Sequence, residues 1–293
     1  MRKLLVLLAL ATGVLATSAL PAGAITGDYV EDTEHPFVGL VAFYDESGEY
    51  SHRCSGSLLT PTVFLTAGHC TTDFFGSTAT ARVYFQQDAL ADPSKSGFPD
   101  GCAPGTLGVT CATSDEIYDY DYATSGPPGR DFPDTRDVGL VILDQPIYLS
   151  EYGELAAPGT LDRLATKRGL RETTFTHSGY GATESSPLHR LHLGERLMAK
   201  SKLTNLGSAM TGVYSLQVNF NGKGYGGACY GDSGGPVFYG GYSSNIIVAL
   251  AGWNNNGNCA GVGYFYRTDR QEVIDWILQT VPQDQVGNIK IVG

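Results

Sequence analysis

A serine flanked by glycines is the residue in this sequence best suited to chemistry. It lies in Gly231-Asp232-Ser233-Gly234-Gly235-Pro236. A serine hydroxyl is a weak nucleophile and needs an exposed position and a neighbouring base. Flanking glycines allow a sharp turn that directs backbone N–H groups at a developing oxyanion. We therefore predict Ser233 as a nucleophile, with the N–H groups of Gly231 and Ser233 as an oxyanion hole. The plainer alternative is a glycine-rich turn with a solvated serine.

A histidine and an aspartate stand where a base and its orienting group would be needed. His69 follows an apolar run, and Asp137 directly precedes another at residues 138–143. A buried carboxylate that accepts a hydrogen bond from histidine Nδ1–H fixes the tautomer and stabilises the imidazolium. Alone, His69 is one of six histidines and would be taken as structural. Three other carboxylates compete for the orienting role: Asp131, Asp134 and Asp144.

The elements that must position these residues look like short strands separated by turn clusters. One helix is expected over residues 269–281, with Asp269 as its N-cap. Residues 88–137 are rich in Asp, Gly, Pro and Tyr and predict a long surface excursion, with or without a substrate-shaping or partner-binding role. The expected strands are residues 37–44, 54–59, 62–66, 81–86, 138–143, 173–176, 215–220, 236–239, 246–250 and 262–266.

Composition narrows the class of protein. Among 293 residues, 38 are glycine and only 17% are charged, which favours an all-β protein with many tight turns. The formal net charge of −11 repels phosphate backbones and anionic lipids. We therefore expect no nucleic-acid partner and no binding to membrane surfaces.

The first 24 residues read as a signal peptide. Arg2 and Lys3 precede an apolar run at residues 4–15, and Ala22-Gly23-Ala24 suits signal peptidase. The alternative, a membrane-anchoring helix, is disfavoured because the run is short. We expect a secreted, extracellular protein with no membrane attachment once the signal is removed.

Export to an oxidising compartment favours disulfides for the six cysteines. A zinc site is disfavoured because no C-x-x-C motif occurs. Sequence alone does not choose among the pairings, although the cysteines fall into three local groups: Cys54 with Cys70, Cys102 with Cys111, and Cys229 with Cys259.

The order histidine, aspartate, serine resembles that of chymotrypsin/trypsin-like serine proteases. Gly179-Tyr180-Gly181 resembles an aromatic-glycine turn of that family's second barrel, and Gly252-Trp253-Asn254 resembles the segment that pairs with substrate backbone. Pairings of Cys54 with Cys70 and of Cys229 with Cys259 would match the family's disulfides beside the histidine and the serine.

The resemblance implies an all-β fold of two antiparallel Greek-key six-stranded β-barrels, packed together with a C-terminal helix. Residues 25–293 would form one trypsin-like peptidase domain, and its substrates would be proteins or peptides. It would act as a monomer without a cofactor or metal. The implied divisions are residues 25–155 for the first barrel, 156–268 for the second, 269–281 for the helix and 282–293 for the tail.

The family resemblance also implies an activation mechanism. A new amino terminus at Ile25 would fold inward and form an ion pair with Asp232, the residue before the serine. Ile25 directly follows the expected signal cleavage, so signal peptidase itself would produce the activating terminus. Cleavage after Ala19 would instead leave a short pro-segment.

The pocket for the residue before the cleaved bond is implied to have Gly227 at its floor, six residues before Ser233. No Asp or Glu occurs in residues 225–230 or 251–266, so a buried Arg or Lys of the substrate would lack a partner. Ala251 stands where a histidine would help to bind a substrate Glu, and Asn254 replaces a common glycine. We expect cleavage after small or medium neutral residues. The implied substrate-binding residues are Gly227, Ala228, Gly252, Trp253 and Asn254.

Two other functions fit parts of the sequence. One is an inactive protease homologue that serves as a binding protein, which the presence of all three triad residues disfavours. The other is an α/β-hydrolase esterase, because the serine motif satisfies G-x-S-x-G. That fold requires the serine to come first and a helix to start at it, whereas His69 precedes Ser233 and Gly-Gly-Pro follows it.

Overall fold

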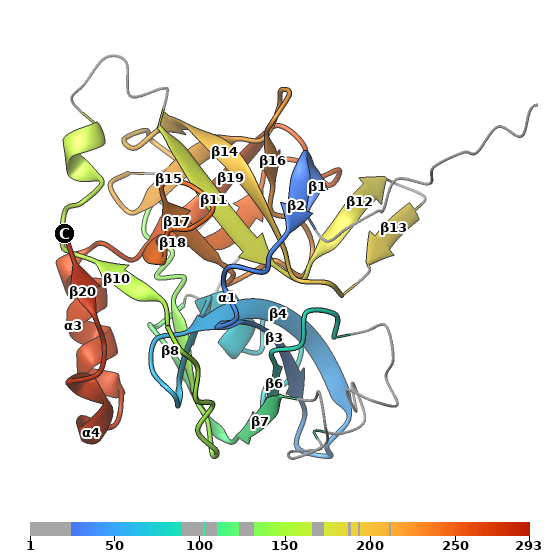
Figure 1. Ribbon diagram of the computed structural model, residues 1–293, viewed down its shortest axis with the longest axis vertical. Helices are drawn as coiled ribbons and strands as arrows, with labels where there is room; N and C mark the ends of the chain where they lie inside the picture. Colours follow the sequence, from blue (N-terminus) through green and yellow to red (C-terminus); the bar gives the residue numbers. More distant parts are fainter. Residues whose placement is uncertain are drawn as a thin grey trace, which may run out of the picture.

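The computed structural model describes residues 25–89, 102, 110–122, 132–165, 173–186, 189–192, 194–210 and 212–293. The expected signal peptide and its cleavage site therefore lie outside the described residues, apart from Ile25 itself. Most of the described chain forms two barrel-like sheets packed against each other, with two helices along one side (Figure 1). The expected all-β class is confirmed.

The first sheet has seven strands in the order β7-β6-β3-β4-β5-β9-β8, and all neighbours are antiparallel. Strand β6 pairs with β3 rather than with β5, the strand before it in sequence. The strands are β3 (Val38–Tyr44), β4 (Tyr50–Leu58), β5 (Val63–Thr66), β6 (Thr80–Tyr84), β7 (Cys111–Ser114), β8 (Glu116–Asp119) and β9 (Gly139–Ile142).

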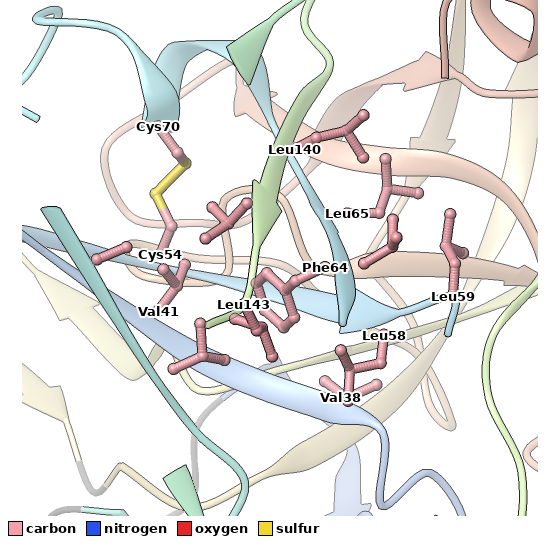
Figure 2. Close-up of a cluster of buried hydrophobic side chains, with 14 of the residues drawn as sticks. Val38, Val41, Cys54, Leu58, Leu59, Phe64, Leu65, Cys70, Leu140 and Leu143 are labelled. Carbon is pink, nitrogen blue, oxygen red and sulfur yellow. A yellow bond between two sulfur atoms is a disulfide. The ribbon is translucent and has the colours of Figure 1, made fainter. Parts of the chain in front are cut away.

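This sheet has one strand more than the six expected, and part of the expected surface excursion belongs to it. Strands β7 and β8 lie within the segment expected to be a surface loop. They form because Cys111, Ala112 and Ser114 are buried against β6 while Ile117 packs on the core. Figure 2 shows the Cys54–Cys70 disulfide and buried side chains from β3, β4, β5 and β9 in the core of this barrel: Val38, Val41, Leu58, Phe64, Leu65 and Leu140.

The second sheet contains a closed ring of six antiparallel strands, because β17 pairs with both β11 and β18. Two short strands join it in parallel: β10 (Glu154–Ala156) pairs with β18 and with β20 (Ile291–Val292). The ring runs β11 (Thr174–Gly179), β14 (Leu197–Asn205), β15 (Ser215–Asn219), β19 (Val262–Arg267), β18 (Ile246–Asn254) and β17 (Pro236–Tyr239).

The first described residues pair with the second barrel, although the first barrel follows them in sequence. Strand β1 (Thr26–Gly27) pairs with β16 (Gly226–Gly227), and β2 (Tyr29–Glu31) pairs with β14. A separate hairpin is formed by β12 (Ala182–Ser186) and β13 (His189–His192). The N-terminal segment is thereby attached beside the loop that carries Ser233.

The expected C-terminal helix is α3 (Gln271–Thr280), which buries Val273, Ile274 and Ile277. Asp269 is not its N-cap, because both carboxylate oxygens accept hydrogen bonds from Arg267 at 2.8 Å and Oδ2 also accepts from the Leu161 N–H. The described residues also contain three short helices: α1 (Gly68–Thr71), the 3-10 helix η1 (Asp162–Leu164) and α4 (Gln283–Val286).

A buried polar network joins the two barrels. Arg196, directly before β14, donates from Nη1 to the carbonyl oxygens of Val38 and Phe85 in the first barrel, each at 3.2 Å. Its Nε donates to the Asp32 carbonyl oxygen at 3.0 Å. The Asp32 carboxylate accepts from the hydroxyl of Ser178 on β11. Positioning of one barrel on the other therefore depends on buried hydrogen bonds as well as on apolar packing.

Candidate active site

His69 and Asp137 are brought together by the pairing of β5 with β9. Thr66 at the end of β5 is paired with Gly139 at the start of β9, so the residues just beyond these strand ends meet. His69 Nδ1 lies 2.9 Å from each carboxylate oxygen of Asp137, and the backbone N–H of His69 donates to Oδ1 at 2.9 Å. Both residues are buried. The geometry places the ring proton on Nδ1 and leaves Nε2 free as a proton acceptor.

Close packing at this junction requires glycine next to the histidine. A Cβ on Gly139 would lie 2.5 Å from Thr71 Oγ1 and 2.8 Å from the Ala67 carbonyl oxygen. A Cβ on Gly68 would lie 2.9 Å from the Tyr122 Cβ. Figure 1 shows α1, which carries His69, at the boundary between the two sheets.

The Ser233 loop is held against the same region from the second barrel. The Ser233 carbonyl oxygen accepts from the Ser55 N–H on β4 at 2.8 Å, and the Gly234 N–H donates to the Ala251 carbonyl oxygen at 2.8 Å. Gly234 has φ +76°, and a Cβ there would lie 2.6 Å from the Ala67 nitrogen. The loop thus packs on the residues immediately before His69. Within the described chain Ser233 Oγ itself makes no hydrogen bond, to His69 or to any other group.

The N–H groups of the Ser233 loop fall into two sets. Those of Asp232, Gly234 and Gly235 donate to carbonyl oxygens of Cys229, Ala251 and Asp232. Those of Gly231 and Ser233 donate to no acceptor among the described residues. Gly231 has φ +97°, a conformation that L-amino acids with a side chain rarely adopt. The N–H groups of Gly231 and Ser233 are consequently available to bind an external oxygen.

Asp232 is buried beneath this loop. Its Oδ1 accepts from the Gly181 N–H and its Oδ2 from the Cys229 N–H, both at 2.8 Å. Burial raises the pKa of Asp232 to about 7, because loss of hydration outweighs these two hydrogen bonds and the positive charge of Arg53. A Cβ on Gly181 would lie 2.4 Å from the Asp232 Cγ, which explains why the Gly179-Tyr180-Gly181 turn needs glycine here.

In the described structure no ion pair joins Asp232 to Ile25, its expected partner. The Ile25 side chain is fully buried and packs with Leu197 and Ala199 of β14. In the full-length chain the Ile25 nitrogen is part of a peptide bond and carries no charge. The ion pair between Ile25 and Asp232 stays a prediction.

The fold and this geometry agree with comparisons to known proteins. The family model described as "Trypsin" matches residues 24–277. The chain belongs to the trypsin family. This confirms the family that the order of His69, Asp137 and Ser233 predicted.

Similar curated proteins are serine proteases and an activating factor from insects. The chain is 24% identical over 279 residues to "CLIP domain-containing serine protease B10" of Anopheles gambiae, covering 88% of this chain and 69% of that protein. It is 27% identical over 267 residues to "Phenoloxidase-activating factor 3" of Holotrichia diomphalia, covering 86% and 71%. It is 27% identical over 273 residues to "Serine protease 7" of Drosophila melanogaster, covering 85% and 62%.

Among solved structures, "HL collagenase" has a TM-score of 0.59 at 17% identity, covering 87% of this chain and 97% of that one. The likeness concerns the fold alone at this identity. It supports the assignment of two packed barrels. In the described part of this trypsin-family chain, no helix is long and apolar enough to cross a membrane.

The six cysteines form the three disulfides that their local grouping suggested. Cys54–Cys70 ties β4 to α1 beside His69, and Cys229–Cys259 ties the segment before Ser233 to the loop after β18. Ligand atoms of Cys54, His69 and Cys70 lie within 4.8 Å of one another. These two sulfurs are bonded to each other, so no thiolate is available there to hold a metal.

The implied substrate-binding residues lie on two segments beside the site. Gly227 and Ala228 are buried just before the Ser233 loop, and residues 252–254 end β18. A Cβ on Gly252 would lie 3.5 Å from Asp137 Oδ2, so this strand end passes next to the His69–Asp137 pair. Trp253 stacks on Tyr264 with ring centroids 4.0 Å apart.

Sequence reasoning missed an aromatic collar around His69, formed by Phe74, Phe75 and Tyr122. Their ring centroids lie 6.5, 5.5 and 6.0 Å from that of His69. Phe74 and Phe75 are 46% and 55% exposed, which is unusual for two large apolar side chains. The signal available in the sequence was the pair of adjacent phenylalanines within a polar turn segment.

Proposed function

We propose that this chain is a secreted, monomeric serine endopeptidase that cleaves protein or peptide substrates outside the cell. Ser233 is its nucleophile, His69 its base and Asp137 the group that orients His69. The observation that carries the proposal is the His69–Asp137 pair, in which His69 Nε2 is free to accept a proton. It lies next to a serine loop in which two N–H groups donate to no described acceptor. Membership of the trypsin family supports the same reading.

The reaction follows from these groups. Ser233 Oγ attacks the peptide carbonyl carbon while its proton passes to His69 Nε2. The negative oxygen of the tetrahedral intermediate accepts from the N–H groups of Gly231 and Ser233. The C–N bond then breaks as His69 returns the proton to the leaving amine. Water, deprotonated by His69, attacks the acyl ester, and Ser233 leaves with the proton. No metal or cofactor takes part in these steps.

The segments beside the serine favour a neutral residue before the cleaved bond. Gly227 and Ala228 offer no carboxylate to a substrate Arg or Lys, and neither do Gly252, Trp253 and Asn254. A cation buried there would lose its hydration without gaining a partner. Cleavage after small or medium apolar residues is therefore proposed.

Maturation is proposed to be removal of residues 1–24 by signal peptidase. The new ammonium at Ile25 would then form an ion pair with Asp232. The burial of Ile25 and the pairing of β1 with β16 support this, because both hold the new terminus beside the serine loop. Mass spectrometry of the secreted protein tests it, and a mature chain that begins before Ile25 would contradict it.

A competing function is an inactive homologue that binds proteins, and it is supported by the lack of a hydrogen bond from Ser233 Oγ to any described residue. Labelling with a fluorophosphonate separates the two functions, since only an activated serine reacts. We expect the secreted protein to be labelled at Ser233 and Ser233→Ala to remain unlabelled. A folded protein that resists labelling would contradict the enzyme proposal.

A further inference from the structure

The space beside Gly227 is occupied by the ring of Phe220. A Cβ on Gly227 would lie 2.1 Å from Phe220 Cγ and Cδ1, a distance far shorter than real Cβ atoms show to any neighbour. A Cβ on Gly263 would lie 2.3 Å from Phe220 Cζ. The ring therefore extends from one glycine to the other. Gly227 lies on β16 and Gly263 on β19, so Phe220 fills the interval between these two strands.

Phe220 is held in this position by its surroundings. It directly follows β15, and its N–H donates to the Gly261 carbonyl oxygen at 2.9 Å. Its ring packs on Phe265 with centroids 5.9 Å apart at 30° and meets the edge of His177 at the same separation. Only 4% of the residue is exposed. Because dense packing surrounds the ring, a ligand cannot displace it without disrupting the core of the second barrel.

Asn254 spans the same interval nearer to the end of β18. Its Nδ2 donates to the Ala228 carbonyl oxygen at 2.8 Å, which links the wall formed by β18 to the wall that leads to Ser233. Its Oδ1 lies 3.1 Å from the Cβ position of Gly263. The Asn254 side chain thus lies beside the same space between β16 and β19 that the Phe220 ring partly fills.

We propose that Phe220 and Asn254 close the specificity pocket, so that the enzyme cleaves after residues with side chains about the size of alanine. This inference rests on the proposed function, because the pocket is defined relative to Ser233. It narrows that function from small or medium residues to small ones. Phe220 supplies an apolar floor and Asn254 limits the width, so valine and larger side chains are disfavoured by steric overlap.

The test is a series of peptides that differ only in the residue before the cleaved bond: Ala, Val, Leu, Phe and Arg. For the wild-type enzyme we expect kcat/KM for Ala to exceed that for Phe by at least about tenfold. Phe220→Ala should raise the Phe-to-Ala ratio of kcat/KM by about 100-fold, because it removes the floor. Ratios are compared so that loss of active protein cancels.

Phe175→Ala is the matched control. Phe175 lies in the same buried cluster as Phe220, but none of the three atoms nearest to the Cβ position of Gly227 or of Gly263 belongs to it. Its truncation weakens the same core, and we expect the Phe-to-Ala ratio to stay within about threefold of wild type. An equal shift in both variants would overturn the assignment of Phe220 to the pocket.

A second route covers a Phe220→Ala variant that does not fold. Asn254→Gly should raise kcat/KM for Val and Leu relative to Ala by about tenfold without touching the core. Inhibition of wild type by peptide boronic acids should favour Ala over Phe before the boron by a similar factor. Wild-type enzyme that cleaves after Phe or Leu as fast as after Ala would overturn the proposal.

Failure of the proposed function would look different. A folded wild-type protein that neither reacts with a fluorophosphonate nor cleaves any peptide would overturn the protease assignment, and this inference with it. Labelling at Ser233 with an unrestricted residue preference would overturn this inference alone.

Discussion

The hydrogen bonds between His69 and Asp137 fix the ring nitrogen that can act as a base. Because Nδ1 donates to the carboxylate, Nε2 carries the free lone pair. An asparagine at 137 would offer an amide N–H that can turn the ring to the other tautomer. The role proposed for Asp137 is therefore mainly one of orientation and charge.

We predict that Asp137→Asn lowers kcat by about four orders of magnitude, which is the loss that the same substitution causes in the prototype of this family. The substitution should leave the unfolding temperature nearly unchanged because the shape is preserved. Initial rates with a chromogenic peptide, together with a thermal melt, provide the measurement. Asp144→Asn is the control, since Asp144 is exposed. A kcat equal to that of this control would contradict the triad assignment.

The Asp232 carboxyl predicts a pH dependence of stability. The pKa of Asp232 is about 7 in the folded chain and 3.8 for an ordinary Asp, as in the unfolded chain. Between these two pH values the folded state therefore binds the proton more tightly than the unfolded state does. Stability of a chain that keeps residues before Ile25 should therefore fall as pH rises from about 4 to about 7. Relative to Asp232→Asn, the fall amounts to about 4 kcal/mol. Urea unfolding across this pH range measures it.

Removal of residues 1–24 should cancel that dependence. An ammonium at Ile25 beside Asp232 would favour the charged carboxylate and lower its pKa. We expect mature protein to show a flat difference from Asp232→Asn between pH 5 and 7. The same downward slope in both forms would argue against the activating ion pair.

At the scale of elements, the sequence predicted strands well where burial is continuous and poorly where it alternates. The runs that became β3, β5 and β9 are fully buried and apolar. Strand β14 was missed because Lys200 and Lys202 interrupt its apolar residues on the outer face. Strands β7 and β8 were missed because their surroundings are rich in turn formers. Pairing with β6 and β9 overrides local preference there.

The start of α3 shows the same limit. Asp269 has the residue type of an N-cap, but its carboxylate is used by Arg267, two residues earlier. The motifs at His69, Asp137 and Ser233 were identifiable because each lies next to a strand end in sequence. Phe220 was not, since only folding brings it between Gly227 and Gly263.

We predict that Asp269→Asn lowers the free energy of unfolding by about 3 kcal/mol, because it leaves the Arg267 guanidinium without its buried counter-charge. Glu272→Gln is the control, since its pair with Arg270 is partly exposed and should contribute less than about 1 kcal/mol. Urea unfolding of both variants supplies the comparison. Similar losses for the two would show that burial of the Arg267 pair adds nothing.

At the scale of the whole molecule, the proposed nucleophile and its base come from different barrels. His69 follows β5 in the first barrel, and Ser233 precedes β17 in the second. Their separation therefore depends on how firmly the barrels are joined. Arg196 makes several of the buried hydrogen bonds between them.

We predict that Arg196→Met lowers the free energy of unfolding by about 3 kcal/mol, because three carbonyl oxygens each lose the hydrogen bond that Arg196 donates. It should also lower kcat in the protein that remains folded. Urea unfolding and kcat per labelled active site test both effects. Arg163→Met, at an exposed position, should change stability by less than about 1 kcal/mol. Unaltered kcat in Arg196→Met would show that the barrels stay in register without it.

The stacking of Trp253 on Tyr264 has an optical consequence. The chain has two tryptophans, and the other, Trp276, lies on α3 next to Tyr120. Replacing Trp276 with phenylalanine would leave a single indole emitter, next to Asn254 at the edge of the proposed pocket. Ligand occupancy then becomes readable from intrinsic fluorescence, with no coloured leaving group and even in a Ser233→Ala background.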